Sequence, residues 1–183
     1  MDRIVVVDSD PKWPAQFQAI VTYLLPFIAG FIVRIEHVGS TSVPGLAAKP
    51  IIDIDVVVAD EARLPTALKR IESAGYQWVG DLGVAGREAF DAPVTPGLPN
   101  HHLYLVEENN RAHCDHWLLR ETLIGNPDLI DRYARIKREN AVFAGEDIDR
   151  YVALKAAFVS EVLSEARRVR AMPPVAYWEP DLG

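Results

Sequence analysis

Runs of β-branched and other apolar residues predict six strands along this chain. Most are bounded by glycine- or proline-rich connections, as strands in a sheet usually are. The predicted strands cover residues 3–7, 31–35, 51–58, 76–79, 87–90 and 101–106. The segment 51–58 reads IIDIDVVV. Because it is apolar on both faces apart from its aspartates, we expect it to be a buried central strand.

A repeat of three to four residues predicts helices between and after these strands. Asp10 followed by Pro11 is a typical helix start, and Gly75 suits the left-handed position after a helix end. The predicted helices cover residues 10–25, 60–75, 115–124, 126–143 and 147–170. This order predicts an α/β (α+β) fold in which helices pack on a mixed β-sheet. We expect one domain with a core over about 1–110, a C-terminal helical subregion over about 113–171 and an irregular tail over 172–183.

The chemistry of the central strand lies in Asp53 and Asp55. Residues i and i+2 of a strand share one face, so their Cα atoms lie about 7 Å apart. Burial of two unpaired carboxylates costs several kcal/mol, roughly, unless cations lie within reach. The pair therefore predicts a site for Mg²⁺ or Mn²⁺. The alternative is that both carboxylates mark the solvated end of the strand.

A turn rich in small polar residues precedes this strand. Gly39 can adopt positive φ and admit a phosphate, while Ser40, Thr41 and Ser42 offer hydroxyl and N–H donors. Such a turn binds anions. We expect a short helical turn over residues 44–48 before the chain enters the central strand. Lys49 then either reaches a phosphate or is an ordinary solvated lysine.

The spacing of these residues resembles a known family. Gly39-Ser40, a gap of twelve residues and the Asp53-Ile54-Asp55 strand are similar to the signature of the DNA polymerase β-like nucleotidyltransferases. The longer string HVGSTSVPGLAAKPIIDIDV resembles the GrpB family closely, which this motif places in that superfamily. The resemblance covers nearly the whole chain and implies a nucleotidyltransferase-like fold.

The resemblance also implies roles for the C-terminal helices. Tyr133 and Lys137 are four residues apart, and Tyr151 and Lys155 repeat the spacing, so each pair shares one helix face. In the superfamily, lysines of the helical region bind the triphosphate, and Lys137 and Lys155 are candidates here. The other interpretation is that each tyrosine packs on a lysine stem.

The chain departs from the family pattern at two places. Tyr104 replaces a histidine in the strand His101-His102-Leu103-Tyr104, and the helix around Arg120-Glu121 lacks a tyrosine and a second arginine. These losses put substrate contacts in doubt more than the metal pair.

The superfamily usually has a third carboxylate on a strand in this region, and residues 101–106 contain no acid. His102 could take its place as a ligand for Mn²⁺, as could Glu107 or Glu88. His102 and Tyr104 share one face and His101 faces the other.

Two further histidine positions leave alternatives open. His37, beside the glycine turn, either contacts a base or substrate or caps its strand. The cluster His113-Cys114-Asp115-His116 matches no tetrahedral zinc pattern, and Cys114 with Asp115 is interpreted as the lead-in to a helix.

Composition and charge limit the possible partners and cellular location of the protein. With 183 residues, 49% of them hydrophobic, the chain can bury a substantial core. A net charge of -7 argues against nucleic acid or an anionic membrane as partner. The N-terminal residues lack a secretory signal pattern, and the single Cys114 cannot form an internal disulfide. We therefore expect a cytoplasmic protein of undetermined oligomeric state.

These features together favour a metal-dependent nucleotidyltransferase that uses a nucleoside triphosphate and a small-molecule acceptor. In this hypothesis Asp53 and Asp55 hold the metal and carry the catalysis. The alternative is a non-catalytic nucleotide-binding or folding module, of the kind that the resemblance connects with dephospho-CoA kinase fusions. A third hypothesis is a metal-dependent phosphohydrolase, but in such an enzyme the glycine turn would have no clear role.

Overall fold

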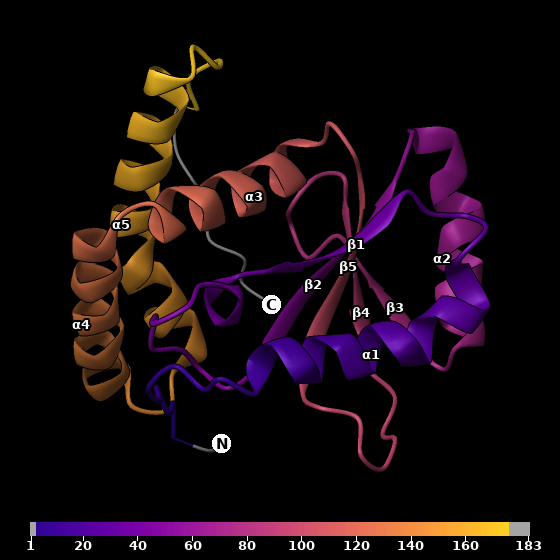
Figure 1. Cartoon of the computed structure of the whole chain (residues 1–183), viewed down its shortest axis with the longest axis horizontal. Coiled ribbons are helices and arrows are strands. Elements are labelled where there is room, and N and C mark those ends of the chain that lie inside the picture. The colour runs from indigo at the N-terminus through magenta and orange to yellow at the C-terminus, as the bar shows by residue number, and fades with distance from the viewer. Residues whose placement is uncertain (1–2, 176–183) are drawn as a thin grey trace.

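The computed structural model describes residues 3–175. Within them the chain forms a β-sheet flanked by helices (Figure 1). The helical elements are α1 Trp13–Ile28, η1 Ser40–Ser42, η2 Glu61–Arg63, α2 Leu64–Ser73, α3 Arg111–Ile124, α4 Pro127–Ala144 and α5 Ile148–Val169, with η1 and η2 being 3₁₀ turns. The strands are β1 Arg34–Val38, β2 Ile52–Val58, β3 Gln77–Gly80, β4 Arg87–Asp91 and β5 His101–Glu107.

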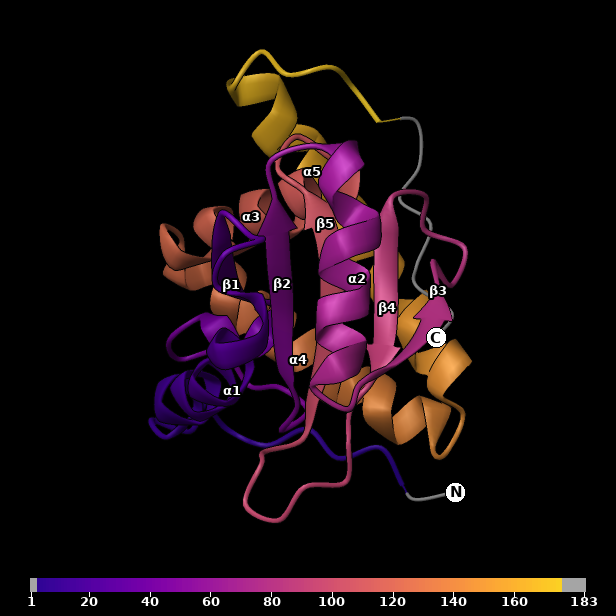
Figure 2. The same ribbon diagram turned by 90° about the vertical axis from the view of Figure 1, so that its right-hand side faces the viewer.

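The strands pair in the order β1-β2-β5-β4-β3 (Figure 2). The β2–β5 pair is parallel, and the other three pairs are antiparallel. This arrangement confirms the predicted mixed sheet. β2 lies between β1 and β5, so the strand that carries Asp53 and Asp55 is internal, as its apolar sequence predicts.

The two faces of the sheet have different partners. One face packs against α1 and α2, where Ile52, Ile54 and Leu103 join Ile20 and Ile71 in an apolar core. Residues of β2 alternate between faces, so the aspartates point to the opposite side. There α3 crosses the sheet (Figure 1). The polar residues of β2 therefore face a helix that begins far along the chain.

The C-terminal helices form a second packed region beside the sheet (Figure 1). Leu118 of α3, Tyr133 of α4 and Phe158 of α5 belong to its core. Asp115 and Arg167, both almost fully buried, form an ion pair that joins α3 to α5. The predicted C-terminal helical subregion is thus confirmed, with its last helix ending at Val169, and residues 176–183 of the predicted tail lie outside the described residues.

The structure corrects several boundaries. Residues 3–7 do not form a strand, because the N-H of Ile4 donates to the carbonyl of Gly145 and only a single bridge joins Val7 to Ala48. The 3₁₀ turn is at η1 rather than at residues 44–48. α1 continues through Pro26 to Ile28 instead of ending near residue 25.

The start of α3 is a further correction. The helix begins at Arg111, four residues before the predicted start, because the Asn110 side chain accepts a hydrogen bond from the N-H of Ala112 and caps it. Cys114 and Asp115 therefore lie within the helix rather than leading into it. In addition, no helix among residues 3–175 has both the length and the apolar character needed to cross a bilayer.

Candidate functional site

A cavity of about 340 Å³ opens between the polar face of the sheet and the C-terminal helices. Residues of η1, β2, β4 and β5 form one wall, and residues of α3, α4 and α5 form the other. Its charged and histidine side chains are Lys49, Asp53, Arg87, Asp91, His102, His116, Arg120, Lys137 and Lys155. The fold thus brings residues from distant segments of the chain to one concave site.

The glycine turn forms one end of this cavity. Gly39 has φ 67° and ψ -169°, a conformation that is open essentially to glycine alone. Gly39, Ser40 and Thr41 line the cavity, but Ser42 does not, and its hydroxyl donates to the carbonyl of Gly39 at 2.6 Å. The positive φ predicted for Gly39 is confirmed.

His37 lies apart from the cavity. Its ring stacks on Phe17 with centroids 4.9 Å apart, and its Nε2 lies 2.9 Å from the hydroxyl of Thr41. Burial lowers the pKa of His37 to about 4. These contacts attach His37 to α1 and to η1, and its contact with a substrate stays a prediction.

Asp53 and Asp55 point to the same face of the sheet, as their spacing predicts. In the parallel register Asp53 lies beside His102, and Asp55 lies beside Tyr104. The Oδ1 atom of Asp53 is 2.9 Å from Nδ1 of His102. The Asp53 side chain is 29% exposed and that of His102 is 48% exposed. This carboxylate and its histidine are therefore open to the cavity.

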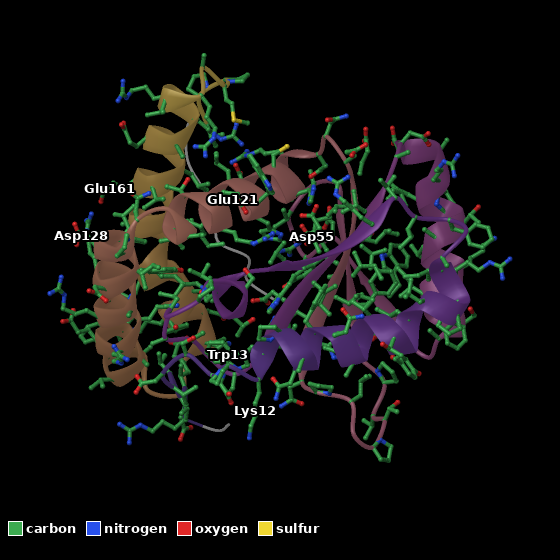
Figure 3. All side chains as sticks on the ribbon, viewed as in Figure 1. Lys12, Trp13, Asp55, Glu121, Asp128 and Glu161 are labelled. Carbon is green, nitrogen blue, oxygen red and sulfur yellow. The ribbon has the colours of Figure 1, made fainter. Side chains whose placement is uncertain are left out.

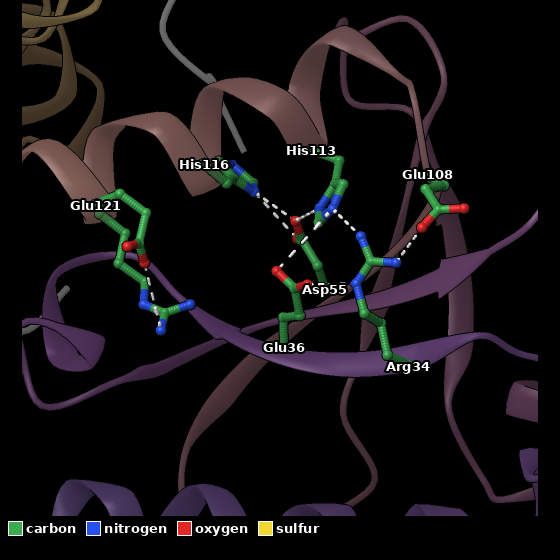
Figure 4. Close-up of polar contacts among 8 residues, drawn as sticks. Arg34, Glu36, Asp55, Glu108, His113, His116 and Glu121 are labelled. Carbon is green, nitrogen blue, oxygen red and sulfur yellow. Dashed lines mark hydrogen bonds and ion pairs between the residues drawn. The ribbon is translucent and has the colours of Figure 1, made fainter. Parts of the chain in front are cut away.

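Asp55 is in a different situation, because its carboxylate is fully buried. Nδ1 of His113 lies 2.9 Å from Oδ2, and Nδ1 of His116 lies 3.0 Å from both oxygens (Figure 4). Both histidines come from the first turns of α3 (Figure 3 shows Asp55 beneath this helix). Asp55 therefore accepts hydrogen bonds that attach α3 to the sheet.

The protonation of His113 follows from its two partners. A carboxylate only accepts, so Nδ1 of His113 carries a hydrogen toward Asp55. The guanidinium of Arg34 only donates, and its Nη2 lies 3.1 Å from Nε2 of His113, so Nε2 carries none. His113 is thus neutral. The 4.0 Å approach of Glu36 to the same Nε2 is accordingly not an ion pair.

Within this network Asp55 carries a negative charge and His116 a positive charge. Burial would raise the pKa of Asp55, but the charge of His116 and the histidine hydrogen bonds outweigh it, so the pKa is lowered. Burial would lower the pKa of His116, but the charge of Asp55 and its hydrogen bond outweigh it, so the pKa is raised. For Asp53, burial would likewise raise the pKa, but the hydrogen bond and charge of His102 together with the charges of Lys155 and His116 outweigh it, so the pKa is lowered. Both aspartates are ionised at neutral pH.

These contacts test whether the aspartates fit a divalent metal. Both oxygens of Asp55 already accept hydrogen bonds from imidazoles, and Asp53 alone of the pair presents a carboxylate to the cavity. Among residues 3–175, no three histidine, cysteine, aspartate or glutamate side chains are grouped so as to hold a metal ion. A site in which both carboxylates ligate the metal does not fit this arrangement.

The predicted alternatives for a third acid lie away from the cavity lining. Glu88 accepts a hydrogen bond from Nε1 of Trp78 at 2.7 Å, and Glu107 pairs with Val58 at the end of β5. Glu36 is the partner of Asp55 across the β1–β2 pair, and it also binds Arg34. A third carboxylate therefore does not face the cavity from β5.

The two predicted tyrosine–lysine pairs line the opposite wall. The Nζ of Lys137 is 4.4 Å from the ring centroid of Tyr133, and that of Lys155 is 5.4 Å from that of Tyr151. Lys49 also faces Tyr151, at 5.9 Å. Each lysine lies over an aromatic face, as the packing interpretation predicts, and each also lines the cavity.

Lys137 differs from the others because it is almost fully buried, with 2% exposure, and its Nζ has no hydrogen-bond partner among the described residues. Burial, and then the neighbouring Lys155, lower the pKa of Lys137 well below its usual value. The face of Tyr133 favours the charged ammonium, but burial without a hydrogen bond is the stronger effect. The wall next to Ser40 thus contains a buried amine whose Nζ has no hydrogen-bond partner among the described residues.

Four charged or histidine residues of this site were not predicted as site residues from the sequence: Arg87, Asp91, His116 and Arg120. Arg87 is 3% exposed, and its guanidinium lies 4.4 Å from the ring centroid of Tyr104. Arg120 follows His116 by one helical turn and has a buried Nε without a hydrogen bond among the described residues. A helix start at Asn110 would have predicted His113, His116 and Arg120 on adjacent turns of one face.

Comparison with known proteins identifies the family. The model of the GrpB protein family matches residues 3–165. UPF0157 protein BH1888 of Halalkalibacterium halodurans is 34% identical over 89% of this chain and 82% of its own length. The crystal structure of the conserved protein GrpB from Enterococcus faecalis has a TM-score of 0.78 and 30% identity, over 91% of this chain and 99% of that one.

A third relative is considerably longer. The dephospho-CoA kinase of Mycolicibacterium paratuberculosis is 31% identical over 82% of this chain, and the match spans 42% of the kinase. The family model covers most of this chain, and the E. faecalis protein matches it along nearly its whole length. The chain belongs to the GrpB family.

Proposed function

We propose that this protein binds a nucleoside triphosphate in the cavity and transfers its nucleoside monophosphate to a small-molecule acceptor. The observation that carries the proposal is the buried Nζ of Lys137, which faces no hydrogen-bond partner among the described residues. Burial of an unpaired ammonium costs several kcal/mol, roughly, so its presence in a cavity wall calls for an anionic ligand. Tyr133, one turn earlier, hydrogen-bonds Ser40 of the glycine turn and so links this lysine to it.

The charge of the cavity supports a polyphosphate as that anion. Its lining has five lysines and arginines but two aspartates, whereas the chain as a whole has a net charge of -7. A cationic concave site on an acidic protein concentrates small anions without attracting nucleic acid. The acceptor is accordingly proposed to be a small molecule.

The residues suggest a division of tasks during transfer. The N-H and hydroxyl groups of Gly39, Ser40 and Thr41 are proposed to bind terminal phosphates, and Lys49, Lys137 and Lys155 neutralise their charge. Asp53 orients His102 through Nδ1, so Nε2 can accept the proton of an acceptor hydroxyl. That oxygen attacks the α-phosphorus, the bond to the β-phosphate oxygen breaks, and pyrophosphate leaves.

A requirement for Mg²⁺ or Mn²⁺ stays a prediction. When bound with the nucleotide, a divalent cation would neutralise phosphate oxygens. Asp53 is the one carboxylate of the predicted pair that is open to such a complex. The hydrogen bonds that Asp55 accepts from His113 and His116 do not support it as a second metal ligand.

The second candidate function is a non-catalytic nucleotide-binding or interaction module. Two observations favour it: Asp55 is occupied by histidines, and a related segment makes up less than half of a dephospho-CoA kinase. A phosphohydrolase remains the third hypothesis. All three candidates can be separated by binding and by product release.

Calorimetric titration with each nucleoside triphosphate, in EDTA and in Mg²⁺, tests the binding step. We expect binding by the wild type, a loss of at least about tenfold in Lys137→Met and no change in Lys69→Met, an exposed lysine on α2 away from the cavity. Asp53→Asn should remove any gain in affinity that Mg²⁺ gives. Equal affinities in wild type and Lys137→Met would refute this site.

Product analysis then tests transfer. The wild type is incubated with a bound nucleotide and a panel of hydroxyl and amine acceptors, and His102→Gln is the matched variant. Release of pyrophosphate that depends on acceptor and on His102 supports nucleotidyl transfer. Release of inorganic phosphate indicates a hydrolase instead, and nucleotide binding without either product indicates the non-catalytic module.

A further inference from the structure

His116 connects the buried carboxylate of β2 to the cavity. Its Nδ1 contacts both oxygens of Asp55, its side chain is 26% exposed, and its ring forms part of the cavity wall. His113 contacts the same carboxylate but is 4% exposed and does not line the cavity. The two histidines therefore have different surroundings although they share one acceptor.

The charges of this cluster follow from its hydrogen bonds. Asp55 is fully buried, and a buried carboxylate requires a cationic partner. His113 cannot supply the charge, because its Nε2 accepts from Arg34 and its Nδ1 donates to Asp55. The positive charge beside Asp55 is therefore carried by His116.

The orientation of His116 leaves one donor for a ligand. Nδ1 is turned toward Asp55, so Nε2 is the ring nitrogen that a molecule in the cavity can reach. The ring lies 5.8 Å from that of Tyr104, and the buried guanidinium of Arg87 lies over Tyr104 as well. The carboxylate end of the cavity thus presents the Nε2 of His116 rather than a pair of open carboxylates.

We infer that His116 contacts the substrate by donating from Nε2 to a phosphate oxygen of the bound nucleotide, and that Asp55 is the positioning residue that holds it. The inference rests on the proposed function, in which the cavity accepts a polyphosphate. It places an imidazolium from α3 where the sequence predicts a metal ion at Asp55. Asp53 remains the open carboxylate of the pair.

Inorganic tripolyphosphate in EDTA is the direct probe, because it contains the anion without a base, a ribose or a metal. The full chain, labelled with ¹⁵N in its histidines, is titrated and its imidazole ¹H–¹⁵N correlations are followed. We expect the Nε2 resonance of His116 to shift on binding while its Nδ1–H toward Asp55 is retained. A bound complex without a shift at His116 overturns the inference.

Affinity measurements provide the second readout. A charge-assisted hydrogen bond to phosphate predicts a loss of about ten- to a hundredfold in His116→Gln. Asp55→Asn should lose a similar factor, because an amide does not hold the imidazolium. The control is His101→Gln, a buried histidine on the opposite face of β5 that contacts Tyr76 and the carbonyl of Pro99, and its affinity should match the wild type.

The remaining outcomes are also decisive. Unchanged affinity in folded His116→Gln, or no binding of tripolyphosphate by the wild type, overturns the inference. If Mg²⁺ alone removes the Nδ1–H contact of His116, then Asp55 is a metal ligand and the inference is wrong. If tripolyphosphate binds and shifts the His116 resonance but no nucleoside triphosphate binds, the proposed function is refuted. The contact between His116 and the anion is then still supported.

Discussion

A Cβ atom on Gly39 would lie 2.2 Å from Oδ2 of Asp53, much closer than any non-bonded contact allows. The glycine turn and the Asp53 carboxylate are therefore packed so closely that only a residue without a side chain fits at position 39. Gly39 is required both for its backbone conformation and for the space that Asp53 occupies. This contact explains why the turn and the strand form one spaced motif in the sequence.

Gly39→Ala should consequently be more harmful than alanine at another glycine of the same loop. The unfavourable backbone and the clash with Asp53 together predict a loss of about 2–4 kcal/mol in the free energy of unfolding. Gly45, with φ 82° and nothing within 4 Å of the position that a Cβ would take, is the matched control, and Gly45→Ala should lose about 1–2 kcal/mol. Urea denaturation of both variants measures the difference. Equal losses would show that the Asp53 contact does not constrain the turn.

The network beneath α3 predicts strong coupling between Asp55 and His113. Asp55→Asn leaves the charge of His116 without its counter-charge and should lower the free energy of unfolding by about 3–5 kcal/mol. His113→Gln breaks the contact to the same carboxylate, so the double variant should lose less than the sum of the two, by about 1–3 kcal/mol. Chemical denaturation of the wild type, the two single variants and the double variant measures the four free energies of unfolding that this comparison needs. Strict additivity would mean that the two residues do not interact.

Local rules predicted much of this site from the sequence. The shared face of Asp53 and Asp55 follows from strand alternation, and the tyrosine–lysine pairs follow from helical spacing. The positive φ of Gly39 follows from its place in a turn between two strands. Each of these features depends on residues that are close in the sequence, so no tertiary information is needed to infer them.

The features that were missed depend on contacts between distant segments. His113 and His116 lie about sixty residues after Asp55, and no local pattern indicates that α3 crosses this part of the sheet. The alternation of residues 3–7 resembles a strand, yet Ile4 packs on the C-terminal helices and its N-H pairs with Gly145. A tertiary contact outweighed local propensity there. The sequence also did not predict that two histidines of α3 contact Asp55, and its role as a metal ligand stays a prediction.

Lys137 should lower the stability of the protein while serving ligand binding. Its ammonium is buried without a hydrogen bond among the described residues, so Lys137→Met, which keeps the volume and removes the charge, should raise the free energy of unfolding by about 1–3 kcal/mol. The same variant should lose nucleotide binding. Thermal and urea unfolding measure the gain, and Lys69→Met on exposed α2 should show none. A destabilised Lys137→Met would mean that this lysine has a structural partner.

The lowered pKa of Lys137 also gives a pH dependence with a definite sign. Between its lowered folded pKa and 10.5, the usual pKa of an unfolded lysine, the unfolded chain binds more protons at this position than the folded one. Stability should therefore rise with pH in that window for the wild type relative to Lys137→Met. Urea unfolding of both proteins from neutral to alkaline pH provides the comparison, and parallel curves would contradict a lowered pKa.

The same pKa shift links ligand binding to protons. A bound phosphate favours the charged ammonium, so binding of a nucleoside triphosphate should raise the pKa of Lys137 and take up protons from the buffer. Calorimetry in buffers of different ionisation enthalpy measures this uptake directly. Lys155→Met keeps Lys137 and removes a neighbouring cation that lowers its pKa, so it should reduce the uptake without abolishing it. Since the proton is taken up where the anion binds, an uptake that persists in Lys137→Met would move the phosphate site to another group of the cavity.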